Sequence, residues 1–264
     1  MKIGLIGGGT MGEAILRSLL RKKLAVKQEV TVSDVAPDRR KLIKKKYGVN
    51  VTDDNMTAAK EAKIIVLAIK PQDIEHVLGQ LAGRLTSQLV ISIAAGVTLE
   101  SLTSKLGYKQ VVRAMPNTPV QVGKGMTTWV GSKELTNDNY IKARVILAAL
   151  GEEHYFTEEK YMDMATAISG SGPAYVFLII EALIDAGVHI GLPRNVAQKL
   201  VIETVSGSTE MMKRANKHPA ELRNMVTSPG GTTAAALYKL ERGGLRSLLV
   251  SAVEAAYNKA RGLG

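Results

Sequence analysis

Residues 2–23, KIGLIGGGTMGEAILRSLLRKK, combine a short apolar run, a glycine-rich loop and an amphipathic helical pattern. Within them Gly7, Gly9 and Gly12 match G-x-G-x-x-G, which is typical of a dinucleotide-binding turn when a strand precedes it and a helix follows. The first glycine allows the tight turn, the second lets the backbone approach a pyrophosphate, and the third lets helix and strand pack closely. The stretch therefore predicts the start of a dinucleotide-binding α/β domain.

The next predicted strand ends in an acidic residue at the distance that such a domain requires. Residues 29–35, EVTVSDV, end in Ser33 and Asp34 before Val35, and Asp34 lies 22 residues after Gly12. The acid that binds the ribose of a dinucleotide follows the glycine loop by about 20 residues. Aspartate is also a common turn residue after a strand, so both interpretations of Asp34 stay open.

Three further apolar runs repeat this pattern, at residues 63–71, 88–97 and 110–120. Their ends carry Lys70-Pro71, Ala94-Ala95-Gly96 and Met115-Pro116-Asn117. Small or conformationally restrained residues at the carboxyl ends of strands let a flat cofactor lie against the backbone. Strands that alternate with helices indicate a doubly wound parallel sheet, and we place this α/β domain at residues 1–157.

From Glu158 onward the strand signals fade and helical patterns follow. The first runs through residues 168–193, with Ser171-Gly172 as its cap, Pro173 at its first position and Gly187 as its stop. Further helices are expected within residues 194–213, 218–226, 232–244 and 245–262. This helical domain, residues 158–264, has too little chain to bury its apolar residues alone. We therefore expect it to pair with a second copy, most simply as a homodimer.

Composition and charge exclude several classes of protein. The chain has no cysteine, which excludes disulfides and thiolate metal sites. Its formal charge of +11 comes largely from clusters at residues 21–23, 39–41 and 44–46. No aromatic residues are interleaved there to stack bases. We therefore expect a basic surface that steers an anionic substrate or cofactor, and no nucleic-acid partner.

Metal and membrane binding are not expected either. Glu181, Asp185 and His189 are spaced by four residues, but the predicted stop at Gly187 separates them. The most apolar stretch, residues 173–180, is shorter than the ~20 residues of a membrane span. The N-terminus shows no secretory leader, so we expect a cytoplasmic protein.

Residues 227–241, TSPGGTTAAALYKLE, begin a helix with more small polar groups than one cap requires. One interpretation is a glycine-rich loop that leads into an ordinary capped helix. The other is an anion site, in which unpaired N–H groups and hydroxyls hold a carboxylate or phosphate. These residues alone leave both interpretations open.

Seven motifs occur together and in order along the whole chain: GGGTMG, LAIKPQ, SIAAGV, RAMPNTP, SGSGPAY, EALIDAGV and SPGGTT. Together they resemble the pyrroline-5-carboxylate reductase family, and SGSGPAY followed by SPGGTT is the most specific combination. The resemblance implies an N-terminal Rossmann domain and an all-helical C-terminal dimerisation domain, assembled as dimers or pentamers of dimers. It also implies hydride transfer from NADPH or NADH to the C=N bond of 1-pyrroline-5-carboxylate, which gives L-proline.

The resemblance assigns roles to particular residues. The implied cofactor-binding residues are Ile6, Gly7, Gly8, Gly9, Thr10, Met11, Gly12, Ser33, Asp34, Asn55, Ala68, Ile69, Lys70, Pro71, Ala94, Ala95, Gly96, Met115, Pro116 and Asn117. The implied substrate residues are Glu159, Ser228, Gly230, Gly231, Thr232 and Thr233. The SPGGTT segment then becomes a carboxylate cradle, and Thr233 is the catalytic residue that hydrogen-bonds the ring nitrogen. We find no general acid–base pair, and hydride transfer to a protonated imine has little need of one, because orientation carries most of the rate.

Two other functions fit the same layout. A β-hydroxyacid dehydrogenase needs a lysine on the first long helix of its second domain, but none occurs between Lys160 and Lys199. A non-catalytic NAD(P)-binding regulatory protein would not need the SPGGTT cradle. The choice of cofactor stays open, because Asp34 favours NADH whereas Arg39 and Arg40 could pair with the 2′-phosphate of NADPH.

Overall fold

The computed structural model describes residues 1–262 and divides into two compact units. The first unit comprises Met1–Ser171 together with the end of the chain from Ala256, and the second comprises Gly172–Ala255. The expected domain boundary after residue 157 stays a prediction. Residues 263 and 264, which end the expected helical domain, lie outside the described residues.

One eight-stranded sheet forms the centre of the first unit. Its strands are β1 (Ile3–Ile6), β2 (Val30–Ser33), β3 (Asn50–Thr52), β4 (Ile64–Leu67), β5 (Leu89–Ser92), β6 (Val111–Pro116), β7 (Gly125–Gly131) and β8 (Gly151–Tyr155). They lie in the order β3-β2-β1-β4-β5-β6-β7-β8, and all neighbours are parallel except β6 and β7. The strand order reverses between β1 and β4, which is where doubly wound sheets bind ligands. The expected fold is therefore confirmed, with β7 and β8 as additions that no sequence motif indicated.

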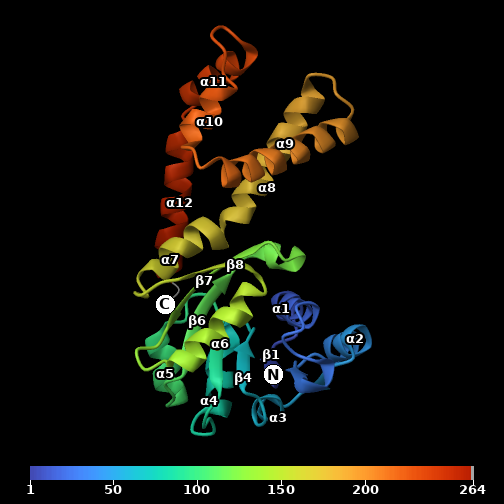
Figure 1. The fold of residues 1–264 in the computed structure, drawn as a ribbon, viewed down its shortest axis with the longest axis vertical. Coiled ribbons are helices and arrows are strands. Elements are labelled where there is room, and N and C mark those ends of the chain that lie inside the picture. The colour runs from blue at the N-terminus through green and yellow to red at the C-terminus, as the bar shows by residue number, and fades with distance from the viewer. Residues whose placement is uncertain (263–264) are drawn as a thin grey trace. The chain divides into compact units, whose positions relative to one another are not determined.

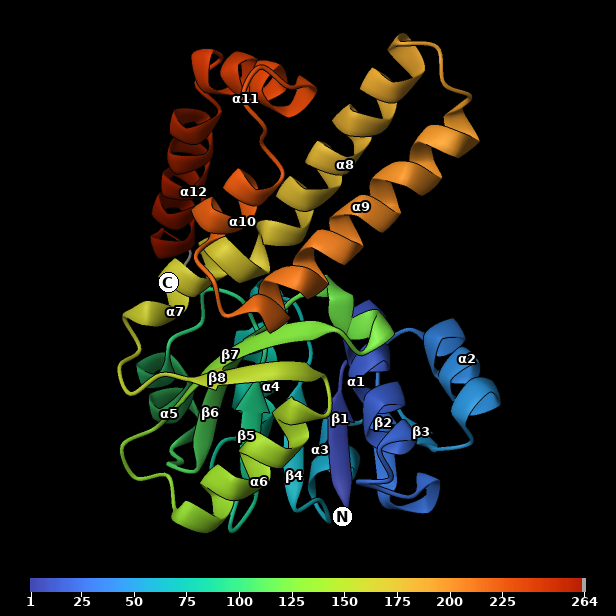
Figure 2. The same cartoon turned by 45° about the horizontal axis from the view of Figure 1, so that its top comes forward.

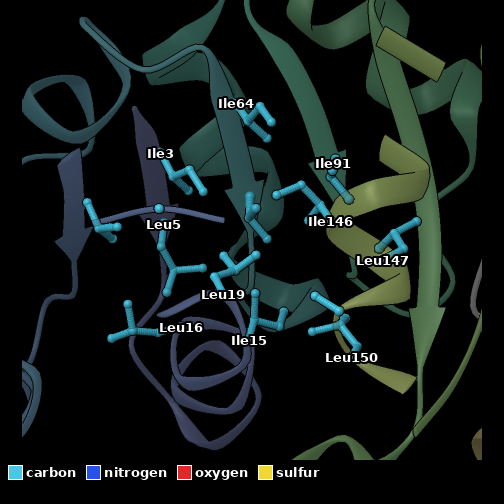
Figure 3. Close-up of a cluster of buried hydrophobic side chains, with 14 of the residues drawn as sticks. Ile3, Leu5, Ile15, Leu16, Leu19, Ile64, Ile91, Ile146, Leu147 and Leu150 are labelled. Carbon is cyan, nitrogen blue, oxygen red and sulfur yellow. The ribbon is translucent and has the colours of Figure 1, made fainter. Parts of the chain in front are cut away.

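Helices cover both faces of this sheet (Figures 1 and 2). They are α1 (Thr10–Arg21), α2 (Pro37–Tyr47), α3 (Asn55–Ala59), α4 (Ile74–Leu81), α5 (Leu99–Leu106) and α6 (Asn137–Ala148). A further helix, α7 (Tyr161–Ala165), follows the last strand, and the short turns are η1 (Lys27–Glu29), η2 (Pro71–Asp73) and η3 (Thr118–Val122). Side chains from α1, α2 and α6 form one core with the sheet, and side chains from α3, α4 and α5 form the other. Figure 3 shows part of the first core, to which β1 contributes Ile3 and Leu5, α1 contributes Ile15 and α6 contributes Ile146. The strands read as continuous apolar runs because both of their faces are buried.

The second unit is entirely helical. It contains α8 (Gly172–His189), α9 (Arg194–Ala215), α10 (Pro219–Met225), α11 (Thr232–Arg242) and most of α12 (Leu245–Arg261). The helices α8 and α9 lie side by side (Figures 1 and 2). The predicted stop at Gly187 is wrong, since α8 continues to His189. A Cβ atom at Gly187 would lie 3.0 Å from Cβ of Ala197, so this glycine serves the close packing of the two helices.

Helical structure also begins earlier in the chain than the sequence predicts. The helix α7 and a π-helical turn, η4 (Thr166–Gly170), lead directly to α8, so that the helical run covers Tyr161–His189. By length and composition it could cross a membrane, although the core helix of a soluble protein passes the same test. Residues 173–180 therefore underestimate the length of the apolar helix that has to be compared with a membrane span, because the helix extends beyond them in both directions. Its apolar side chains include Phe177 and Leu178, which are 62% and 65% exposed within the single chain.

Candidate functional site

The glycine loop between β1 and α1 has the three properties that the sequence predicted for its glycines. Gly7 adopts a φ of +97°, which favours glycine. A Cβ atom at Gly12 would lie 2.0 Å from the carbonyl oxygen of Gly7, so only glycine permits this close packing. Gly9 faces open space, since a Cβ atom at this position would have no residue other than its chain neighbours within 4 Å. Gly9 also caps α1 without any side-chain hydrogen bond, so the positive N-terminus of this helix is open to an anion.

Asp34 folds back onto the glycine loop. Its Oδ2 accepts a hydrogen bond from the Gly8 N–H at 2.8 Å, and its Oδ1 accepts one from the Ala36 N–H at 2.9 Å. The carboxylate therefore lies beside the loop, as the ribose interpretation requires, and it also stabilises its own turn. Both nearby arginines are engaged: Arg39 donates to the Gly8 carbonyl oxygen, and Arg40 donates to the Asp34 carbonyl oxygen at 2.7 Å. Either arginine must break these contacts before it can meet a 2′-phosphate.

Glu13, in the first turn of α1, is a functional candidate that the sequence motifs missed. Its carboxylate accepts hydrogen bonds from Lys46 Nζ at 2.7 Å, from Tyr47 Oη at 2.8 Å and from Arg39 Nη2. Burial opposes ionisation of Glu13, but the hydrogen bonds from Lys46, Tyr47 and Arg39 outweigh it and hold its pKa at about 2. Glu13 is therefore charged at neutral pH and ties α2 to the first turn of α1, directly after the glycine loop.

Most of the other predicted cofactor residues follow the carboxyl ends of neighbouring strands. Ile6 ends β1; Ala68, Ile69, Lys70 and Pro71 follow β4; Ala94, Ala95 and Gly96 follow β5; Met115 and Pro116 end β6, and Asn117 follows it. Parallel strands place these ends at one edge of the sheet, so the fold gathers residues that are up to about a hundred positions apart. A pocket of about 360 Å³ at this edge includes Pro71 and Gly96, together with Gln72 and Thr98.

Three of the predicted cofactor residues, Ser33, Asn55 and Asn117, use their side chains in hydrogen bonds inside the protein. Ser33 is fully buried, and its hydroxyl donates to Asn55 Oδ1 at 2.6 Å. Asn117 donates to the Ser169 carbonyl oxygen at 3.0 Å and accepts from the Met126 N–H at 2.9 Å. A role for Ser33 in cofactor binding must therefore act through the half-buried Asn55, and Asn117 can contribute mainly through its backbone.

Glu159, the predicted substrate residue of the first unit, belongs to a partly buried ion-pair cluster. Arg113 on β6 is 7% exposed and donates to Glu159 Oε1 at 2.8 Å and to Asp163 Oδ1 at 2.7 Å. The same Glu159 oxygen accepts from the Leu99 N–H at the start of α5, at 2.8 Å. This oxygen of Glu159 is therefore committed to structure, and the role of Glu159 in substrate binding stays a prediction.

The remaining predicted substrate residues lie in the second unit, at the start of α11. Gly231 caps this helix without a side-chain hydrogen bond. Its own N–H donates to the Ser228 carbonyl oxygen at 3.1 Å and so closes the turn, and the role of Gly231 in the cradle stays a prediction. Among residues 1–262, the N–H groups of Thr232 and Thr233 have no acceptor. The helix therefore presents unpaired donors and two hydroxyls at its positive end, which suits a carboxylate.

No metal centre is evident in the described part of the chain. Glu181, Asp185 and His189 all lie on α8, contrary to the expectation that Gly187 separates them. Even so, no group of three or more His, Asp or Glu side chains within residues 1–262 is arranged to hold a metal ion. Asp185 instead accepts a hydrogen bond from Arg194 Nη2 at 2.7 Å.

Two family models match the chain. The model described as pyrroline-5-carboxylate reductase dimerisation matches residues 159–263. The model described as NADP oxidoreductase, coenzyme F420-dependent, matches residues 2–96. The two matches therefore fall on the helical half of the chain and on the half that carries the glycine loop.

Relatives and solved structures match over the full length. The pyrroline-5-carboxylate reductase of Synechocystis sp. is 45% identical over 264 residues, which cover 100% of this chain and 98% of that protein. The crystal structure of Plasmodium falciparum pyrroline carboxylate reductase with NADP bound has a TM-score of 0.91 at 36% identity, covering 100% of this chain and 98% of that one. The structure of a pyrroline-5-carboxylate reductase from Coxiella burnetii has a TM-score of 0.92 at 38% identity, with the same coverage.

Proposed function

The chain belongs to the pyrroline-5-carboxylate reductase family, and we propose that it reduces 1-pyrroline-5-carboxylate to L-proline with NADPH or NADH, the final step of proline biosynthesis. The observation that carries this proposal is the 45% identity to a reductase of that name over the whole chain. That identity spans both the glycine loop and the helical unit. A β-hydroxyacid dehydrogenase shares this layout but needs a lysine on the first long helix of its second domain, where this chain has none. A silent regulatory protein would not need the SPGGTT segment.

The residues at the carboxyl edge of the sheet fit a dinucleotide. The uncapped start of α1 and the open space at Gly9 are where a pyrophosphate can approach the backbone. Asp34 and Asn55 would hold the ribose end, while the residues after β4, β5 and β6 would lie along the nicotinamide end. When bound, the reduced nicotinamide supplies the hydride.

The start of α11 is the proposed carboxylate site. Supporting this are the free N–H groups of Thr232 and Thr233 and the absence of any side-chain cap at Gly231. Ser228 and Gly230 would complete the cradle, and Gly231 would shape it by closing the turn. The positive helix end contributes ~0.3–1 kcal/mol toward a bound anion.

Thr233 is the proposed catalytic residue, because its hydroxyl can hydrogen-bond the ring nitrogen of the substrate. The hydride adds to the imine carbon, and the electron pair of the C=N bond moves to the protonated nitrogen. The nitrogen already carries the proton of the amine product, so no further proton transfer is required. The protein then has to orient the two reactants and exclude water.

The chain forms an oligomer through its dimerisation domain. We further propose that a homodimer is the smallest stable species and that the complete assembly is this dimer or a pentamer of dimers. The homodimer is supported by apolar side chains of the second unit that are exposed in the single chain, namely Phe177 and Leu178 of α8 and Leu248 and Val250 of α12. Burial between subunits would also explain the apolar helix without a membrane, and we place the enzyme in the cytoplasm, without a nucleic-acid partner.

Two experiments test these proposals. Purified protein with 1-pyrroline-5-carboxylate should oxidise NADPH or NADH, as followed by the absorbance of the reduced nicotinamide, and should form proline. Cofactor binding without substrate-dependent oxidation would refute the enzymatic proposal. Light scattering after gel filtration should find a dimer or a multiple of it, whereas a folded monomer at micromolar concentration, or protein soluble only in detergent, would refute the proposed assembly.

A further inference from the structure

A chain of side-chain hydrogen bonds runs from the end of β2 to the exposed face of α4. Ser33 Oγ donates to Asn55 Oδ1 at 2.6 Å, Asn55 Nδ2 donates to Gln80 Oε1 at 2.7 Å, and Gln80 Nε2 lies 3.0 Å from His76 Nε2. The two outer members differ in exposure, since Ser33 is fully buried whereas His76 is exposed. Gln80 and His76 lie outside every motif that indicates the cofactor site.

The two amides must point the same way for this chain to form. An amide group has a donor side and an acceptor side of nearly the same shape. If the amide of Asn55 were reversed, its carbonyl oxygen would face the carbonyl oxygen of Gln80. Gln80 presents its oxygen to Asn55 when its own Nε2 donates to His76 Nε2, which requires the tautomer with the ring hydrogen on Nδ1. In that arrangement Gln80 sets the orientation of Asn55, while Ser33 donates from the other side.

This orientation determines what Asn55 offers to its surroundings. An amide nitrogen carries two hydrogens, and Gln80 accepts only one of them. The other hydrogen of Asn55 Nδ2 has no acceptor among residues 1–262. Because Asn55 is bonded to the end of β2, where the ribose of a dinucleotide binds, this free donor suits the acceptor oxygens of a 2′-phosphate.

We infer that Gln80 is a positioning residue for cofactor selectivity, which acts by holding Asn55 as a donor toward the 2′-phosphate of NADP(H). The inference rests on the proposed cofactor site but not on the identity of the substrate. The role of Gln80 is indirect, because its side chain contacts Asn55 and His76. The donor that Gln80 orients favours NADP(H), whereas the carboxylate of Asp34 repels a 2′-phosphate. The two opposing effects give a reason why this turn could accept both cofactors.

The test replaces Gln80 with methionine, which keeps the length of the side chain and removes its hydrogen bonds. Equilibrium titration of the purified protein with NADP⁺ and with NAD⁺ measures both dissociation constants without any substrate. Gln80→Met should weaken NADP⁺ binding roughly tenfold, the loss of one hydrogen bond to a charged group, with little change for NAD⁺. Gln121→Met is the matched control, because Gln121 is exposed and its side chain makes no hydrogen bond to any of residues 1–262.

A double-mutant cycle separates positioning from general loosening of the fold. In an Asn55→Ala background, Gln80→Met should have no further effect on the ratio of the two dissociation constants. His76→Leu, which frees the Gln80 amide, should shift the ratio in the same direction by a smaller factor. Equal weakening of both cofactors, an unchanged ratio, or an effect that persists without Asn55 would overturn the inference. Because only binding is measured, failure of the proposed reductase activity would be seen separately in the turnover assay.

Discussion

Replacement of Glu13 by glutamine should destabilise the first unit in a way that depends on pH. The substitution keeps the size of the side chain and removes the charge that Lys46, Tyr47 and Arg39 bind. The pKa of Glu13 is about 2, below its ordinary value of 4.5. Because the folded state lowers this pKa, the stabilisation is fully present above about pH 5 and is lost as the pH falls from 4.5 toward 2.

The expected size follows from the same two values. The gap between 4.5 and about 2 corresponds, at ~1.36 kcal/mol per pH unit, to ~3 kcal/mol of folding free energy at pH 7. By pH 3.5 part of this contribution is gone, and ~2 kcal/mol remains. The Glu13 side chain is only 15% exposed, so solvent screens these contacts much less than it screens a surface ion pair. The gap in stability between the wild type and Glu13→Gln should therefore narrow by about a third between the two pH values.

Urea unfolding followed by tryptophan fluorescence measures this difference. Trp129 is the only tryptophan of the chain, is fully buried and lies on β7, so it reports on the same unit as Glu13. Glu61→Gln is the matched control, because Glu61 pairs with Lys2 on the surface, where it is 74% exposed, and its replacement should have a much smaller effect. Equal destabilisation at pH 7 and pH 3.5, or none at pH 7, would show that the carboxylate is not stabilised by these three donors.

Three further substitutions test the site and its support. Asp34→Ser should shift the ratio of the kcat/KM values toward NADPH, starting from values for the two cofactors that lie within about a hundredfold, or ~2.7 kcal/mol; an unchanged ratio would mean that Asp34 does not face the ribose. Thr233→Ala should lower kcat by ~10–100-fold with little change in cofactor affinity, and an unchanged kcat would remove Thr233 from the mechanism. Arg113→Met should cost up to ~3 kcal/mol of stability, the low end of the range for a buried pair, because the carboxylates that it leaves unpaired, Glu159 and Asp163, are 29% and 27% exposed. A loss below ~1 kcal/mol in the urea assay would show that Arg113 contributes no more than a surface pair.

Local sequence patterns predicted the parts of the fold that local chemistry determines. The glycine loop, the apolar strands of the parallel sheet and the helices from α9 onward follow from spacing and capping within a few residues. The strand β7 reads GMTTWVG, whose β-branched and aromatic residues favour a strand, but its two threonines interrupt the continuous apolar run that marks the other strands. The strand β8 reads GEEHY and carries no strand signal. The strand β7 pairs antiparallel with β6, and β8 pairs parallel with β7 across the intervening helix α6, so β8 is a strand because of a partner far from it in the sequence.

Gly187 shows how a correct local rule fails. Glycine ends many helices because it adopts left-handed conformations, and the sequence offers no reason to reject that interpretation here. The structure uses the other property of glycine, the absence of a side chain, to bring α8 against Ala197 of α9. Since that neighbour lies ten residues further along the chain, only the packed structure distinguishes the two uses.

The preference for NADH or NADPH cannot be predicted from the types of residue near Asp34, because it depends on which of those side chains are free to move. In the sequence, Arg39 and Arg40 are two charges near Asp34 that are free to swing toward a phosphate. In the structure each arginine already makes hydrogen bonds. Arg39 donates to Glu13 and to the Gly8 carbonyl oxygen, and Arg40 donates to the carbonyl oxygen of Asp34. Recruiting either one to a 2′-phosphate would exchange these charge-assisted hydrogen bonds for new ones of similar strength, so the net gain for NADPH is small. A neutral donor such as Asn55, already oriented by Gln80, requires no such exchange, and selectivity should therefore respond more to Gln80 than to either arginine.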